Sequence, residues 1–199
     1  CSLRPPLRQL DLARRWLERN VGPGKTVISL TLRESPMQAE RNSKIEEWQK
    51  LIDHYRGTNV VFVVVRDFFT VYQKPALTGD NVVECPEAVL NILFRSALYE
   101  AVDLNLFVLN GPCCLCFFNP RTRYLVFGVP SDPESDRTRR LAFRDGLEPG
   151  DHVKGAGRFQ RLVWEADEFP IIRREVEHML SVLDRPIDTP SASFSDSGS

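Results

Sequence analysis

The chain has 199 residues, 42% of them hydrophobic, and is long enough to bury a core in one large domain or two small ones. Its 26 basic and 27 acidic residues leave a net charge of −1, so the composition gives no support to nucleic acid as a partner. No apolar run approaches the roughly 18 residues of a membrane-spanning helix. We therefore expect a soluble, globular protein with no membrane span.

Five cysteines are present, and three of them crowd into the segment 113–116. An odd number of cysteines in a chain too large to need disulfides indicates reduced thiols, so we expect a cytoplasmic protein. A tetrahedral metal site would need Cys85 and Cys1 to complete it, and we expect no metal. We interpret the cysteines of 113–116 as small residues that pack the first turn of a helix. Because Cys1 opens the chain, a missing N-terminal domain stays open as an interpretation.

Helix and strand patterns alternate along the first third of the chain. Apolar residues at helical spacing predict a helix over residues 7–20, and a β-branched run predicts a strand over 27–32. Ser43 and Glu46 have the spacing of a capping box and predict the start of a second helix. The run 60–65 then predicts a buried strand. A helix between two buried strands indicates a βαβ unit.

The same alternation continues to residue 183. The predicted elements are a short strand at 81–84, a helix from Pro86 to Ala101, a strand at 104–109, a short helix at 113–118, strands at 124–128 and 159–164, and a final helix from Asp167 to Leu183. Residues 131–159 are charged and rich in turn residues, with a short helix predicted at 136–143.

This order of elements predicts the α/β class, with an open, mostly parallel sheet and helices on both faces, as in Rossmann-like folds. We expect residues 1–183 to form one such domain, either complete in itself or half of a two-domain enzyme. Residues 184–199 consist largely of Pro, Ser, Asp and Gly and predict a disordered tail, because they lack the apolar content that offsets the entropy of ordering.

Ligands of open parallel sheets bind beyond the carboxyl ends of the strands, and this rule selects two loops. The first, 33–42, is long for a βα connection and offers Arg33, Arg41 and Asn42 to a phosphate group. A solvated loop with surface charges is the alternative. The second is the turn Asn110-Gly111-Pro112 between a buried strand and a helix, where free backbone N–H groups favour an anion. Together the two loops predict a clamp for a diphosphate.

The residues offer little for catalysis. Neither a Gly-x-Gly-x-x-Gly nor a Walker-type loop is present, which argues against a dinucleotide dehydrogenase or a P-loop enzyme. Glu34 is the carboxylate nearest the predicted site but is a weak general base, and Lys154 and Arg158 could reach a phosphate from the turn-rich segment. The histidines are interpreted as surface or packing residues: His54, His152 and His178. The catalytic residues therefore stay unassigned.

One stretch of the chain resembles a known family. This stretch begins with Ala101-Val102-Asp103-Leu104 and leads to Asn110-Gly111-Pro112-Cys113-Cys114. The two segments are similar to the Ala-Asp-Leu-x-Leu strand and the Ser-Gly-Pro-Met-His turn of heptosyltransferase-like, GT-B-type glycosyltransferases. The order of elements over residues 7–183 resembles their donor-binding, C-terminal half. Leu109 and Cys114 depart from the acidic residue and the histidine that often flank that turn.

The resemblance implies a nucleotide-sugar donor as substrate, no further cofactor, and transfer of the sugar to an unidentified acceptor. It implies that Asn110, Gly111 and Pro112 lie against the diphosphate or the sugar and that the Arg33 loop contacts phosphate. Two alternatives stay open: a noncatalytic α/β interaction module, and another transferase on a similar scaffold, such as a pyruvyl transferase.

Overall fold

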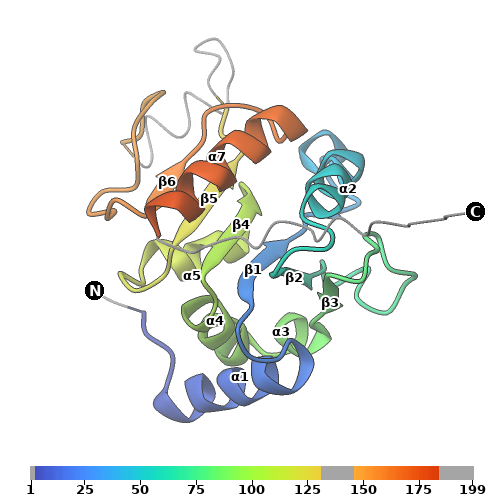
Figure 1. Ribbon diagram of the computed structural model, residues 1–199. Helices are drawn as coiled ribbons and strands as arrows, with labels where there is room; N and C mark the ends of the chain where they lie inside the picture. Colours follow the sequence, from blue (N-terminus) through green and yellow to red (C-terminus); the bar gives the residue numbers. More distant parts are fainter. Residues whose placement is uncertain (1–2, 131–145, 184–199) are drawn as a thin grey trace, which may run out of the picture.

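A computed structural model describes residues 3–130 and 146–183. Six strands form one sheet in the order β3-β2-β1-β4-β5-β6, and each neighbouring pair is parallel (Figure 1). The strands are β1 Thr26–Thr31, β2 Val60–Val65, β3 Val82–Glu84, β4 Leu104–Val108, β5 Tyr124–Phe127 and β6 Gln160–Leu162. The predicted α/β fold with a parallel, Rossmann-like sheet is confirmed.

Helices cover both faces of the sheet. They are α1 Leu7–Asn20, α2 Ile45–His54, α3 Pro86–Leu90, α4 Ile92–Ala101, α5 Cys114–Phe117 and α7 Phe169–Val182, with 3₁₀ turns η1 Ala39–Arg41 and η2 Gly111–Cys113. α2 and α7 lie on one face; α3, α4 and α5 lie on the other, where α1 packs on α4 (Figure 1). Among the described residues, no helix has the length and apolar content to cross a membrane.

The strands form two cores because their side chains alternate between the two faces of the sheet. All residues of β1 and β2 are buried; Ile28 and Leu30 join the core under α2 and α7, and Val27 joins the opposite core. Trp48 of α2 is fully buried and meets the ring of Phe127 edge-on, with 5.5 Å between centroids. Burial on both faces explains why β2 is a continuous apolar run in the sequence.

The polar contact at the start of α2 differs from the prediction. Its N-terminal cap carries no side-chain hydrogen bond, so the capping box predicted at Ser43 and Glu46 is wrong. Ser43 Oγ instead accepts a hydrogen bond from the Arg33 amide, at 2.9 Å. The carboxylate of Asp167, far away in sequence, accepts from the Lys44 amide at 2.8 Å. A carboxylate from another element thus occupies the amino end of α2.

The single helix predicted from Pro86 to Ala101 is also wrong, because the chain breaks at Asn91 into α3 and α4. Asn91 adopts an extended backbone, and its side-chain oxygen accepts from the amides of Leu93 and Phe94, at 3.0 Å each. It is an N-cap in the middle of an apolar helical pattern. The helix predicted at 136–143 and the tail at 184–199 lie outside the described residues.

Candidate functional site

The two predicted loops meet at the carboxyl edge of the sheet. β1 and β4 are paired neighbours, and the strand order runs outward from them in both directions, which is the position where such sheets bind ligands. A cavity of about 450 Å³ opens there. Five of the six predicted site residues line it: Arg33, Arg41, Asn110, Gly111 and Pro112. The sixth, Asn42, does not line the cavity but bonds to Arg33.

Arg33 holds its own loop together. Its guanidinium donates from Nη1 to the Gln38 carbonyl at 3.0 Å and to the Asn42 side chain, and from Nη2 to the Met37 carbonyl at 2.9 Å. The residue is only 9% exposed. Burial, followed by the charge of Arg41, lowers the pKa of Arg33 below its ordinary value. Much of the donor capacity expected for a phosphate is therefore used inside the loop.

Asn42 is also part of this scaffold. Its Oδ1 accepts from the Ser35 amide at 3.0 Å, and its Nδ2 donates to the Ser35 carbonyl at 2.9 Å. Between them, Gln38 has a φ of +56°, the one positive value at a non-glycine position in the described part of the chain. This conformation is unfavourable for L-residues and is held by the bonds from Arg33 and Arg41 to Gln38. The loop therefore has a defined conformation that its own hydrogen bonds hold, unlike a solvated loop with surface charges.

Two atoms at the cavity lack partners. Arg41 Nε, a donor, and Asn110 Oδ1, an acceptor, are both buried and make no hydrogen bond with any described residue. Leaving such a group buried and unpaired costs about 1–3 kcal/mol. Both residues line the same cavity, so the unpartnered atoms lie on side chains of its wall.

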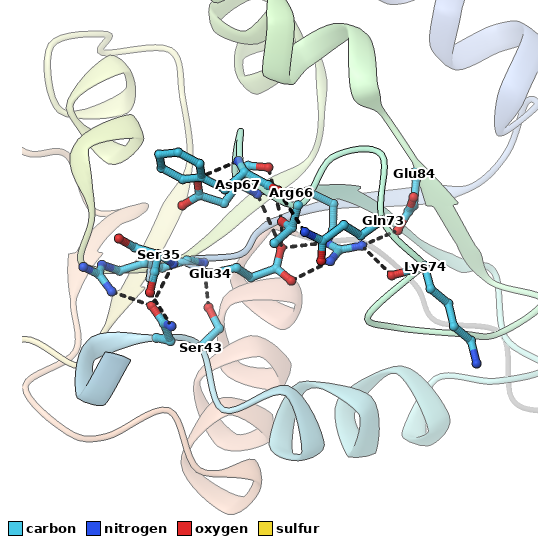
Figure 2. A network of polar contacts seen from close by, with 12 residues as sticks. Glu34, Ser35, Ser43, Arg66, Asp67, Gln73, Lys74 and Glu84 are labelled. Carbon is cyan, nitrogen blue, oxygen red and sulfur yellow. Dashed lines mark hydrogen bonds and ion pairs between the residues drawn. The ribbon is translucent and has the colours of Figure 1, made fainter. Parts of the chain in front are cut away.

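An ion-pair network ties together the loops at this edge of the sheet (Figure 2). Arg66, directly after β2, donates to both oxygens of Glu34: Nε to Oε2 and Nη2 to Oε1, each at 2.6 Å. Its Nη1 also donates to the Lys74 carbonyl at 3.2 Å and lies 3.4 Å from Oε1 of Glu84. The hydroxyl of Thr70 donates to Glu34 at 2.7 Å. The loops after β1 and β2 and the end of β3 are therefore tied together at one point.

The same network sets the charge state of its members. Burial acts to raise the pKa of Glu34, but hydrogen bonds from Arg66 and Thr70 outweigh it, and the pKa is lowered. The hydrogen bond to Glu34 raises the pKa of Arg66 despite its burial. Glu34 is an ionised structural carboxylate, which weakens it further as a general base.

The cavity wall is rich in positive charge. In the described part of the chain, four arginines line it, against one carboxylate, that of Asp67. Arg66 is balanced by its acidic partners, so three guanidinium groups face one carboxylate. Arg95 donates to the carbonyls of Ala88 and Val89, at 2.5 and 3.4 Å. The lining therefore favours an anion.

Arg66, Asp67, Phe68 and Arg95 were not predicted as site residues. The first three follow the buried strand β2 without a break, so the carboxyl-end rule that selected Arg33 could also have selected them. Arg95 is different. It lies within α4, and only the tertiary fold brings it to the cavity.

The remaining candidates lie elsewhere. His54 Nε2 is 3.1 Å from a carboxylate oxygen of Glu177 on α7, and His152 Nδ1 accepts from the Leu162 amide at 3.3 Å. Arg158 stacks over the ring of Phe159. None of these residues lines the cavity, nor do His178 and Lys154.

The cysteines do not form a metal site in the described part of the chain, where no group of three or more His, Cys, Asp or Glu side chains is placed to hold an ion. Cys113 and Cys116 are buried next to the Asn110 turn, and Cys113 Sγ donates to the Asn110 carbonyl. The hydrogen bond with Cys114 and burial raise the pKa of Cys113; burial raises that of Cys116. Both are therefore poor nucleophiles.

Comparison of the chain with protein-family models, with curated proteins and with solved structures gave no match. The resemblance to GT-B-type glycosyltransferases therefore depends on the turn at 110–114 and on the order of elements.

Proposed function

We propose that the cavity binds the diphosphate of a nucleotide-sugar and that the chain is the donor-binding part of a glycosyltransferase. The observation that carries the proposal is the pair of unpartnered buried atoms, Arg41 Nε and Asn110 Oδ1, at a cavity with an excess of guanidinium charge. A phosphate oxygen accepts from Arg41, and a sugar hydroxyl donates to Asn110. A sugar diphosphate carries both kinds of group.

Such a site contributes to transfer by positioning and by charge. As the bond between the sugar and the diphosphate breaks, negative charge develops on the leaving nucleotide, and guanidinium groups held in place stabilise it. Arg41 is the lining residue with the most donor capacity for this role, since Arg33, Arg66 and Arg95 each donate to carbonyl or carboxylate oxygens of the chain. The acceptor and its general base come from outside this cavity.

The compartment is part of the same proposal. The buried cysteines Cys85, Cys113 and Cys116 are free thiols, which supports a reducing compartment such as the cytoplasm.

Calorimetric titration tests the binding step. The ligands are inorganic pyrophosphate, a set of nucleoside diphosphates and nucleotide-sugars, and phosphoenolpyruvate. Removing a charged hydrogen bond costs about 1.5–3 kcal/mol, so we expect Arg41→Gln to weaken diphosphate binding by about ten-fold or more. Lys154→Gln, outside the cavity, is the matched control and should bind as the unmodified chain does.

The other results separate the alternatives. Binding of phosphoenolpyruvate without any diphosphate would favour a pyruvyl transferase. Failure of every ligand to bind the folded protein would contradict the proposal and favour a noncatalytic interaction module.

A further inference from the structure

We infer that Asp67 and Phe68, the two residues that follow Arg66 after β2, form a nucleoside subsite, in which the Phe68 ring stacks on the base and the Asp67 carboxylate accepts from ribose hydroxyls. The inference rests on the proposed function, because it places the nucleoside of the same ligand. Both residues line the cavity that holds Arg41 and Asn110.

Phe68 is exposed although its loop is fixed. The residue is 66% exposed, in a wall otherwise dominated by polar groups. The residues on either side of it are anchored: Arg66 and Thr70 both bond to Glu34, and the Thr70 amide donates to the Asp67 carbonyl at 3.1 Å. Phe69 meets the Phe68 ring edge-on, with 6.0 Å between centroids. A braced aromatic ring with a free face is a stacking platform for a planar group.

Asp67 marks a part of the cavity that does not suit phosphate. Among the described residues that line the cavity it is the only carboxylate, so it repels an anionic group and favours donors such as hydroxyls. Its Oδ1 accepts only a long bond of 3.4 Å, from the Phe69 amide. Arg33 is close enough to Asp67 for their charges to interact, which keeps the carboxylate beside the cationic part of the cavity.

The order of these residues along the sheet edge matches the order of groups in a nucleotide-sugar. Phe68 follows β2, Arg41 lies in the loop after β1, and Asn110 follows β4; these three strands are neighbours in the order β2-β1-β4. A ligand laid along this edge would place its base at Phe68, its diphosphate at Arg41 and its sugar at Asn110. The cavity volume of about 450 Å³ lies within the usual range of roughly 300–1,000 Å³ for small-molecule sites.

The test compares ligands with and without the nucleoside by calorimetric titration. Base stacking on an aromatic side chain is worth about 1–3 kcal/mol, so Phe68→Ala should weaken binding of nucleoside diphosphates by about 5- to 150-fold. Binding of pyrophosphate should change by less than about two-fold. Tyr72→Ala is the matched control: Tyr72 is 80% exposed on the same loop and does not line the cavity, and the variant should bind both ligands normally.

Two further variants complete the test. Phe68→Trp should keep nucleoside diphosphate affinity because the platform is retained, and Asp67→Ala should weaken ribonucleoside diphosphates while tightening pyrophosphate through loss of a repelling charge.

The outcomes separate the two proposals. Pyrophosphate binding with no gain from the nucleoside, or equal loss of both ligands in Phe68→Ala, would overturn the subsite and leave the diphosphate site standing. Absence of binding by either ligand would overturn both.

Discussion

Glu34→Gln tests whether the network of Glu34, Arg66 and Glu84 holds the loops of the site in place. In the folded chain the Arg66 side chain is 5% exposed and that of Glu34 is 13% exposed, and two bonds of 2.6 Å join them. A neutral amide keeps the shape of Glu34 but removes the charge and turns one acceptor into a donor that faces the guanidinium. Arg66 then keeps only Glu84, at 3.4 Å, and the Lys74 carbonyl.

The magnitude follows from these contacts. Each charge-assisted bond contributes about 1.5–3 kcal/mol, and breaking a buried ion pair by removing one partner typically costs about 3–5 kcal/mol. The remaining contacts to Glu84 and Lys74 offset part of this loss. We expect Glu34→Gln to lower the free energy of unfolding by about 3 kcal/mol, which corresponds to a decrease of about 6–12 °C in Tm for a chain of this size.

Urea unfolding at pH 7 measures the effect. Glu165→Gln is the matched control, because its ion pair with Arg174 is 48% and 55% exposed and should contribute less than about 1 kcal/mol. In an Arg66→Met background, Glu34→Gln should cost much less, since no buried guanidinium is left without its partner. A loss below about 1 kcal/mol in the otherwise unmodified chain would refute the reasoning.

The pH dependence gives an independent check with a defined sign. The pKa of Glu34 is lower in the folded chain than in the unfolded one, so its contribution is present above the unfolded value of about 4.3. That contribution is lost as the pH falls through the lowered, folded value. The stability difference between the unmodified chain and Glu34→Gln should therefore shrink on acidification below about pH 4. A difference that stays constant over this interval would contradict the assignment.

Three further predictions concern the scaffold. Burial raises the pKa of Asp167, so ionisation of this carboxyl group disfavours folding. Urea unfolding measured at decreasing pH, from pH 7 through that raised pKa, should show the unmodified chain gaining stability relative to Asp167→Asn. Asn105→Ala removes the hydrogen-bond partner of Ser29 Oγ and of the Tyr99 carbonyl inside the sheet. It should lower the free energy of unfolding, measured in urea, by about 3 kcal/mol. A decrease of less than about 1 kcal/mol would contradict this prediction. Iodoacetamide at pH 8 should label Cys114 well before the other described cysteines, as followed by peptide mass spectrometry. Cys114 is exposed, whereas the other three are buried and have raised pKa values, about 12 for Cys85. Equal labelling rates would refute this prediction.

Local pattern was enough to predict most elements of the fold, because β1, β2, β4 and β5 are buried on both faces and the main helices have a distinct apolar side. The order of the strands in the sheet could not be predicted from local pattern. β4 follows β3 in the chain but does not pair with it. β4 instead pairs with β1, on the edge of β1 that is opposite to β2. Pairing of parallel strands depends on packing between distant segments and leaves no local signal. The break at Asn91 was missed because apolar spacing continues across it.

The position of the site was predictable, but the division of roles within it was not. The carboxyl-end rule located the Arg33 loop and the Asn110 turn, and the structure brings both to one cavity. What a sequence does not contain is the set of partners each polar group finds. Arg33 was expected to face a ligand, yet three of its hydrogen bonds go to its own loop. Its contact with phosphate stays a prediction.

Hydrogen-bond saturation therefore distinguishes the residues that shape this edge from those that can bind. Arg66 and Glu34 satisfy one another, so a ligand that competed for them would have to replace strong buried bonds and would gain little net free energy. Arg41 Nε and Asn110 Oδ1 have no partner among the described residues, so a ligand group that bonds to them displaces no existing hydrogen bond. Phe68 is the apolar counterpart, a ring whose exposed surface a stacked base would remove from water. Ligand affinity at this site should accordingly depend most on the groups without partners. The buried arginines, Arg33 and Arg66, should affect affinity mainly by holding the conformation of their loops.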